Sequence, residues 1–276
     1  MRLATVRRDG GTRAAVGDEQ GWVVFDETDA QELISQPAWR ERAEAALRHP
    51  ARTDLDEGAF ANPVPRPAKV LCCGLNYRDH IVETGREVPT YPTLFAKFAD
   101  TLTGPLDDIV VHDTERLDWE AELAVVVGTE VHRADRETAR AAILGYAVSN
   151  DISMRDWQQR TLQWVQGKAF DGTTPVGPYI VTVDEIEPRD GLRVTCVVSG
   201  EMMQDGDTKE LVFDAADLVA YVSQITRLRP GDIILTGTPG GVALGMPEPR
   251  WLRDGDVVTT TIEGIGELCN SIRFGR

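Results

Sequence analysis

Two glutamates stand at alternate positions where an apolar run begins. Glu120 and Glu122 lead into the valine-rich stretch 123–127. A β-strand directs residues i and i+2 to the same face, so both side chains would point the same way, about 6–7 Å apart. Two like charges beside a buried strand are costly unless a cation holds them. From the residues alone, the pair indicates either a solvated acidic edge of a sheet or part of a metal site.

A third carboxylate, Asp151, closes another apolar stretch, 143–151. No histidine or cysteine lies beside any of the three acids in the sequence. Carboxylate oxygens without nitrogen or sulfur ligands suit a hard divalent cation. Glu120, Glu122 and Asp151 therefore predict a site for Mg²⁺ or Mn²⁺ rather than Zn²⁺.

A histidine and a glutamate are spaced for one helical turn. His80 and Glu83 are three residues apart, between Gly74 and Gly85. A glutamate beside a histidine fixes its tautomer and raises its basicity, which suits activation of a water molecule. The glycines indicate a short segment that can move as a lid does. A solvated helix turn is the alternative.

Basic residues give a further signal, because the chain has 25 arginines but only four lysines. Lys97 and Lys168 lie among aromatic and turn residues, where a compact ammonium would be wanted that a guanidinium cannot replace. Arg155 and Gln158, one turn apart, suit a substrate carboxylate or carbonyl. Each of these residues is also compatible with an ordinary surface position.

A buried strand-like run leads into a loop rich in threonine, glycine and proline, residues 236–241. Such a loop can present backbone N–H groups and hydroxyls to an anion. It lacks the G-K-[ST] of a P-loop and the G-x-G-x-x-G of a dinucleotide site. A nucleotide cofactor is therefore not indicated.

Composition restricts the partners. The 276 residues carry a formal net charge of −16, which argues against nucleic acid and anionic membranes. No apolar run approaches the roughly 18–20 residues of a membrane span, and residues 1–10 lack the apolar core of a signal peptide. We expect a cytoplasmic protein whose four cysteines are reduced and buried.

The chain divides at a proline-rich stretch, 61–67, which predicts a small N-terminal domain (1–66) and a catalytic domain (67–276). Helices are expected at 31–47, 135–144 and 214–227. Strands outnumber helices and do not alternate with them, which favours an α+β fold with a large β core. The expected strands are 3–6, 21–25, 69–74, 109–111, 119–127, 147–150, 179–183, 193–199, 233–236, 257–262 and 267–272.

Several motifs, taken in order, resemble the fumarylacetoacetate hydrolase family over residues 68–276. Each is weak alone, and their common order carries the resemblance. They are Gly74-Leu75-Asn76-Tyr77 with His80 and Glu83, Asp118-Trp119-Glu120-Ala121-Glu122, Asn150-Asp151 with Arg155-Asp156-Trp157-Gln158, Gly167-Lys168-Ala169-Phe170-Asp171, and Thr236-Gly237-Thr238-Pro239-Gly240-Gly241.

The resemblance implies a mixed β-roll fold, mostly β, in a homodimer. It implies Mg²⁺ or Mn²⁺ held by Glu120, Glu122 and Asp151, and a small anionic 2-oxo acid as substrate. It also implies site roles for further residues: His80, Glu83 and Lys168 in catalysis, and Tyr77, Arg155, Gln158 and Thr238 in substrate binding.

One departure from the family's pattern restricts the range of expected substrates. The eukaryotic hydrolase that names the family has an additional aspartate ligand before its catalytic histidine, whereas residues 71–74 carry no carboxylate here. The chain therefore resembles the bacterial branch acting on smaller 2-oxo acids, and neither fumarylacetoacetate nor Ca²⁺ is favoured.

The expected reaction is cleavage of a C–C bond in a 2-oxo or 2,4-dioxo acid, with His80 and Glu83 activating water. Decarboxylation of an oxaloacetate-like acid and isomerisation of a 2-hydroxy-dienoate in aromatic catabolism are alternatives. An alternative of another class is a protein that binds metal and a small acid without turnover.

Overall fold

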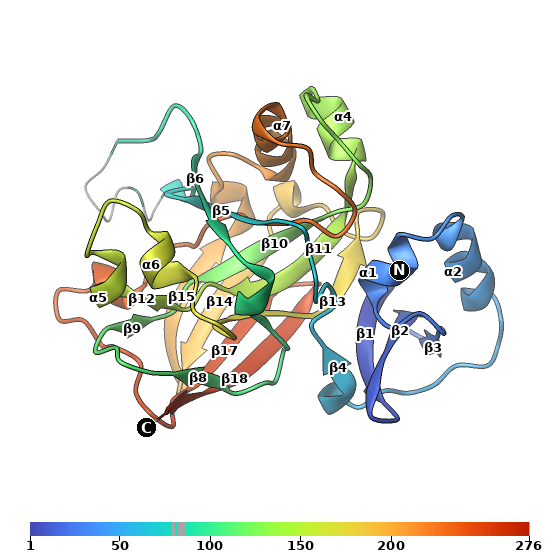
Figure 1. The fold of residues 1–276 in the computed structure, drawn as a ribbon, viewed down its shortest axis with the longest axis horizontal. Helices are drawn as coiled ribbons and strands as arrows, with labels where there is room; N and C mark the ends of the chain where they lie inside the picture. Colours follow the sequence, from blue (N-terminus) through green and yellow to red (C-terminus); the bar gives the residue numbers. More distant parts are fainter. Residues whose placement is uncertain (79–80, 82–86, 276) are drawn as a thin grey trace.

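The computed structural model describes residues 1–78, 81 and 87–275, and strands dominate it (Figure 1). Eleven strands form one sheet, whose main path runs β3-β2-β1-β13-β11-β10-β16-β5-β6, with β4 beside β1 and β7 beside β13. These strands are β1 (Arg2–Arg8), β2 (Gly11–Asp18), β3 (Gly21–Val24), β4 (Phe60–Ala61), β5 (Val70–Gly74), β6 (Thr93–Lys97), β7 (Leu102–Thr103), β10 (Ala121–Val127), β11 (Ile143–Asn150), β13 (Thr174–Thr182) and β16 (Ile233–Leu235).

A second sheet has five strands in the order β15-β14-β17-β18-β8. Its members are β8 (Ile109–Val111), β14 (Arg193–Val198), β15 (Glu201–Asp207), β17 (Val257–Ile262) and β18 (Gly266–Phe274), and a short pair joins β9 (Leu117–Asp118) to β12 (Ser153–Met154). Parallel and antiparallel pairs occur together. The expected α+β fold, mostly β with mixed sheets, is confirmed.

Helices are few and short. In the part of the chain that the structure describes, the α-helices with given bounds are α1 (Ala30–Ile34), α2 (Trp39–Leu47), α4 (Arg136–Ala141), α5 (Arg155–Gln158), α6 (Val165–Lys168) and α7 (Ala215–Ile225). The 3₁₀ turns are η1 (Glu57–Ala59), η2 (Ala99–Thr101), η3 (Pro188–Asp190), η4 (Thr208–Glu210) and η5 (Ala243–Gly245). In Figure 1, α4 and α7 lie side by side, where their residues pack together.

The central strand β10 is buried along its whole length, and its two faces belong to different cores. Leu123 and Val125 join the core that the five-stranded sheet covers, which includes Ile262. Ala124 and Val126 face a second core with residues of the N-terminal part. Because strand faces alternate, Glu120 and Glu122 share the side of Ala124. The acidic pair therefore sits at the end of a fully buried strand.

The N-terminal residues extend the large sheet, because β1 pairs antiparallel with β13 through Arg2↔Val181. Leu3 is fully buried in the same core as Ala124 and Val126. A separate N-terminal domain ending at residue 66 remains a prediction.

Two predicted helix bounds are wrong. The helix expected over 31–47 is interrupted between α1 and α2, near Pro37, which lacks the N–H that a continuing helix needs. The helix expected over 135–144 begins where predicted, with Asp135 as its N-cap through a hydrogen bond from Thr138 N, but it ends at Ala141. Gly145 lies in β11, where a Cβ atom would stand 2.1 Å from Val181 O. Residues 143–150 are buried at every position and form β11, so the end of the predicted helix lies in the sheet instead.

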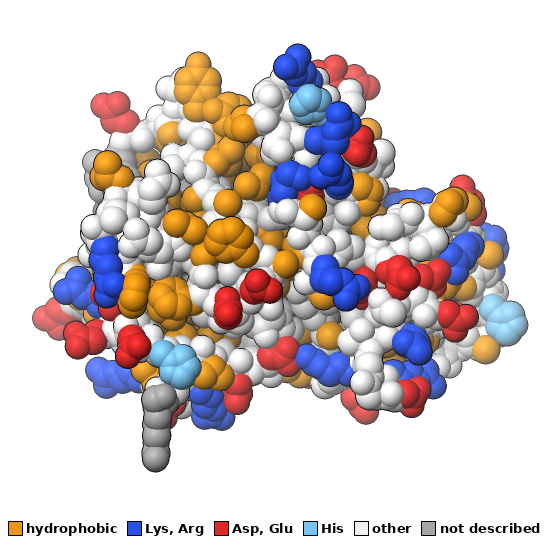
Figure 2. All heavy atoms as spheres, viewed as in Figure 1, with side chains coloured by type: hydrophobic (Ala, Val, Ile, Leu, Met, Phe, Trp, Pro, Cys, Tyr) orange, Lys and Arg blue, Asp and Glu red, His pale blue; other side chains and the backbone are white. Residues whose placement is uncertain are grey.

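The surface shown in Figure 2 has basic and acidic side chains interspersed, with hydrophobic side chains gathered near the centre of that face. This face presents no continuous basic surface of the kind that follows a nucleic-acid backbone. Among the described residues, no helix is long and apolar enough to cross a membrane.

Candidate metal centre and substrate cleft

The three predicted metal ligands meet at one end of the β10–β11 pair. The antiparallel register places Ala121 opposite Asn150, so Glu122 in β10 and the flanking residues Glu120 and Asp151 share that end. Asp151 N donates to Glu120 O at 2.8 Å. Carboxylate oxygens of Glu120, Glu122 and Asp151 lie within 4.8 Å of one another, and all three residues are buried.

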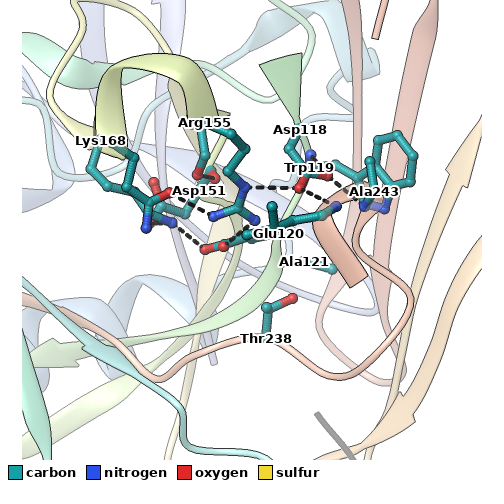
Figure 3. A network of polar contacts seen from close by, with 12 residues as sticks. Asp118, Trp119, Glu120, Ala121, Asp151, Arg155, Lys168, Thr238 and Ala243 are labelled. Carbon is teal, nitrogen blue, oxygen red and sulfur yellow. Dashed lines mark hydrogen bonds and ion pairs between the residues drawn. The ribbon is translucent and has the colours of Figure 1, made fainter. Parts of the chain in front are cut away.

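Glu120 is held as an anion by two buried cations (Figure 3). Lys168 Nζ lies 2.5 Å from its Oε2, and Arg155 Nη2 lies 2.6 Å from its Oε1. Burial by itself would raise the pKa of Glu120, but the charges of Lys168 and Arg155 outweigh it and lower the pKa well below its usual range. Glu120 is therefore charged in the folded protein.

Glu122 has the opposite electrostatic environment. Burial, and then the charges of Asp151 and Glu120, raise its pKa well above 4.5. Its Oε2 accepts a hydrogen bond from Gly237 N at 2.7 Å. A divalent cation among the three carboxylates would offset the cost of this third charge. The donor set and the raised pKa of Glu122 fit Mg²⁺ or Mn²⁺.

Both lysines singled out by their scarcity are buried beside Asp151. Lys97 Nζ contacts Asp151 Oδ1, and Lys168 Nζ lies 3.1 Å from Asp151 Oδ2. Burial would lower the pKa of Lys168, but the charges of Asp151 and Glu120 outweigh it and raise the pKa. Lys168 is thus placed as an ammonium group beside the acids. Lys97 was not among the predicted site residues, although the shortage of lysine had marked it.

Arg155 forms ion pairs with two of the buried acids and also lines the cleft. Its Nε donates to Asp118 Oδ2 at 2.8 Å, its Nη2 pairs with Glu120, and its Nη1 donates to Gln158 Oε1 at 2.8 Å. Arg155 and Gln158 were predicted to bind substrate. Both line the cleft described below, and their role in substrate binding remains a prediction.

A cleft of about 110 Å³ opens over Glu120, Glu122 and Lys168. Apolar side chains form its walls: Phe95, Trp164, Val242 and Leu244. Gly74 also lines the cleft, and a Cβ there would stand 2.4 Å from the Trp164 ring, so a larger residue would displace that ring. The remaining lining residues are Cys73, Leu75, Arg155, Gln158, Gly237, Thr238 and Gly245.

The other predicted site residues differ in where they lie. Thr238 lines the cleft, with its Oγ1 accepting a hydrogen bond from Gln204 Nε2 at 2.7 Å. Tyr77 is fully buried, forms an isolated β-bridge with Leu211, and is not among the described residues that line the cleft. His80 and Glu83 lie outside the described residues.

The cysteines are free. Cys72, Cys73 and Cys196 are buried as predicted, whereas Cys269 is only partly buried. Burial raises the pKa of Cys73, at the floor of the cleft, to about 12. Cys73 is therefore a neutral thiol near pH 7 and does not add charge to the site.

Removing the Lys97 ammonium is expected to alter metal affinity rather than the fold. In Lys97→Met, Asp151 loses a cationic partner, so the site becomes more negative and binds Mn²⁺ about tenfold more tightly, as titration calorimetry would measure. The same change should raise KM for an anionic acid. Lys69→Met is the matched control, since Lys69 pairs with Asp232 at 3.4 Å outside the cleft lining. Unchanged or weaker Mn²⁺ binding would contradict this expectation.

Comparisons with known proteins agree on one family. The protein-family model described as fumarylacetoacetate (FAA) hydrolase C-terminal matches residues 69–273 of this chain. Human mitochondrial oxaloacetate tautomerase is 43% identical over 219 residues, covering 78% of this chain and 70% of the relative. Because that relative is mitochondrial, the expected cytoplasmic location remains a prediction.

Solved structures extend the match to the whole chain. Fumarylacetoacetate hydrolase from Exiguobacterium antarcticum is 33% identical, with a TM-score of 0.85 and 100% of both chains covered. Maleylpyruvate hydrolase from Sphingobium sp. SYK-6, solved with manganese(II) and pyruvate, is 28% identical, with a TM-score of 0.81 and the same coverage. The chain, by its sequence and its fold, belongs to the fumarylacetoacetate hydrolase family of enzymes.

Proposed function

We propose that this chain is a divalent-metal-dependent enzyme that interconverts the keto and enol forms of a small 2-oxo acid of the oxaloacetate type. The observation that carries the proposal is the set of three carboxylates within 4.8 Å of one another, beside Lys168, in a small cleft. The 43% identity to an oxaloacetate tautomerase supports proton transfer as the reaction.

Charge favours an anionic acid in this cleft. Four buried carboxylates meet three buried cations in one network; the acids are Asp118, Glu120, Glu122 and Asp151, and the cations are Lys97, Arg155 and Lys168. The chain thus contributes one net negative charge, and a divalent cation makes the site positive. An acid with one or two carboxylates would complete the balance.

Glu120, Glu122 and Asp151 would hold Mg²⁺ or Mn²⁺, which when bound supplies Lewis-acid polarisation of a 2-oxo oxygen. The Lys168 ammonium would donate a hydrogen bond to an oxygen that gains charge as a proton leaves C3. Gln158 and Thr238 would orient the carboxylate ends. His80, oriented by Glu83, is the group we expect to carry the proton between C3 and the oxygen.

Hydrolysis of an acylpyruvate is the second candidate, favoured by the 100% coverage of maleylpyruvate hydrolase. In that reaction His80 would take a proton from water, the hydroxide would add to the distal carbonyl, and the C–C bond would break. Pyruvate enolate would leave and take up a proton. Decarboxylation of oxaloacetate and isomerisation of a dienoate would use the same acids and the same ammonium.

A product assay on purified protein with Mg²⁺ or Mn²⁺ separates these reactions. We expect enol-oxaloacetate to disappear faster than in buffer, without release of CO₂ and without pyruvate. Acylpyruvate cleavage without tautomerisation would favour the second candidate. If wild-type protein loaded with either metal turns over no 2-oxo acid, a binding role replaces both proposals.

His80→Ala tests the predicted proton carrier. We expect tautomerisation to fall by about 10²–10⁴-fold, the usual contribution of a positioned acid–base group, while Mn²⁺ affinity stays unchanged. His132→Ala is the control, because that histidine is exposed and does not line the cleft. Full activity of His80→Ala would assign the proton to another group. Survival of oxaloacetate decarboxylation in this variant, with acylpyruvate cleavage lost, would indicate two activities in one site.

A further inference from the structure

Asp118 is a fully buried carboxylate that no step of the proposed reaction uses. Its Oδ1 accepts hydrogen bonds from Trp119 N at 2.9 Å and Ala243 N at 2.8 Å. Its Oδ2 accepts from Arg155 Nε at 2.8 Å and Leu244 N at 3.0 Å. Four donors therefore converge on one side chain, from the neighbouring Trp119, from Arg155 and from residues 243–244; Figure 3 labels Trp119, Arg155 and Ala243 among them.

One side of this network leads to the metal ligands. The Arg155 side chain is only 4% exposed and is held at Nε by Asp118, so its Nη2 meets Glu120 Oε1 at 2.6 Å. A guanidinium that bridges two carboxylates transmits position as well as charge, because its donors have fixed geometry. The orientation of Glu120 therefore depends on Asp118 through Arg155.

The other side leads to a cleft wall. Residues 242–245, which include η5, are here called the wall segment, and Val242, Leu244 and Gly245 in it line the cleft. Asp118 anchors this segment at two successive backbone N–H groups. The neighbouring Trp119 adds a hydrogen bond from Nε1 to Gly241 O at 3.2 Å.

We infer that Asp118 is a positioning residue that fixes the wall segment and Glu120 relative to each other. Asp118 thereby influences which 2-oxo acids the cleft accepts, according to the size of their substituent. Leu244 is 42% exposed as a residue and lines the cleft from this anchored turn. A shift of the turn would change the space beside the acids, and a shift of Arg155 would change the cation site. The inference rests on the proposed function for its substrate and on the carboxylate cluster for its metal.

The test compares Asp118→Asn with wild type in two measurements. An asparagine keeps only one acceptor oxygen, so two of the four donors that now meet Asp118 would face an amide NH₂ group and lose their acceptor. We expect Mn²⁺ affinity, measured by calorimetry, to fall about tenfold, because Arg155 loses one of its two carboxylate partners and the site becomes more positive. We also expect the kcat/KM ratio between oxaloacetate and a 2-oxo diacid one methylene longer to change at least about fivefold.

Asp232→Asn is the matched control for buried aspartate. Asp232 is fully buried and accepts from Lys69 N and Arg229 N at 2.9 Å, but it does not line the cleft. It should lose stability as Asp118→Asn does, with Mn²⁺ affinity and the substrate ratio unchanged. If Asp118→Asn also leaves Mn²⁺ affinity and the substrate ratio at their wild-type values, the inference is wrong.

Asp118→Glu keeps the test decisive if the asparagine variant does not fold. It retains the charge but lengthens the side chain, so Mn²⁺ affinity should stay within about threefold of wild type while the substrate ratio shifts. An unchanged ratio in Asp118→Glu would overturn the inference. Wild-type protein that binds Mn²⁺ but acts on no 2-oxo acid would instead overturn the proposed function, and the effect of Asp118 on metal affinity could still be measured.

Discussion

Glu122→Gln should bind no Mn²⁺ measurable by calorimetry and should retain no metal-dependent activity, while its fold persists. Glutamine keeps an oxygen that can accept the hydrogen bond from Gly237 N, so the loop stays in place. It removes the Glu122 carboxyl group, whose pKa is raised by burial and by the charges of Asp151 and Glu120. The metal-free fold should therefore become more stable, and Glu122→Ala should lose the metal in the same way.

The pH dependence gives this prediction a sign. A carboxyl group whose pKa is higher in the folded chain holds its proton there after the unfolded chain has lost it. The metal-free wild type should thus lose stability as pH rises above about 4.5, and Glu122→Gln should not show this loss. Thermal unfolding in EDTA between pH 4 and pH 8 measures the difference. Retained Mn²⁺ binding in Glu122→Gln would refute its role as a ligand.

Glu120→Gln is the contrasting variant, two residues away in the same motif. The pKa of Glu120 is lowered, because Lys168 and Arg155 outweigh its burial, so its charge stabilises the fold above the unfolded pKa. Removing that charge leaves two buried cations poorly balanced and should destabilise the metal-free protein. Both variants should lose metal affinity, and their effects on metal-free stability should have opposite signs.

Local pattern was enough to predict part of this site. Alternation in a strand predicted that Glu120 and Glu122 share a face, and no long-range information was needed for that. Asp151 was predicted as a third ligand from its place at the end of an apolar stretch, and the resemblance supported that prediction. The register that pairs Ala121 with Asn150, on which the approach of Asp151 depends, could not be predicted from the residues. The position of Asp118 in its network could not be anticipated, because the donors Ala243 and Leu244 lie more than 120 residues away.

The fold shows the same division. Valine-rich strands such as β10 could be predicted, because a strand buried along its whole length carries a continuous apolar run in the sequence. The longer strands β2, β6 and β15 were missed, as were the two-residue strands β4, β7, β9 and β12. In the described sheets β6 and β15 are edge strands, and the exposed polar positions of β15 resemble a loop. Tertiary pairing decides such segments, since β-propensity depends on the neighbouring strand and on burial.

Lys168→Met should lower kcat by about 10²–10³-fold, the usual effect of removing one donor to a developing negative charge. Lys168 contacts Glu120 and Asp151 and lines the cleft, so it can meet both the metal ligands and a substrate oxygen. Removing its charge leaves the acids more negative. Mn²⁺ affinity should therefore stay the same or rise, in contrast to Glu122→Gln.

The comparison with Lys168→Arg separates charge from shape. The Lys168 side chain is only 2% exposed, and its Nζ lies 5.4 Å from the centre of the Phe95 ring, so the site leaves little room for a planar guanidinium. We expect arginine not to restore kcat even though it restores the charge. Lys209→Met, on the surface, should leave kcat unchanged. If Lys168→Met keeps kcat within about threefold of wild type, the ammonium only balances the charge of Glu120 and Asp151 and does not stabilise the reacting oxygen.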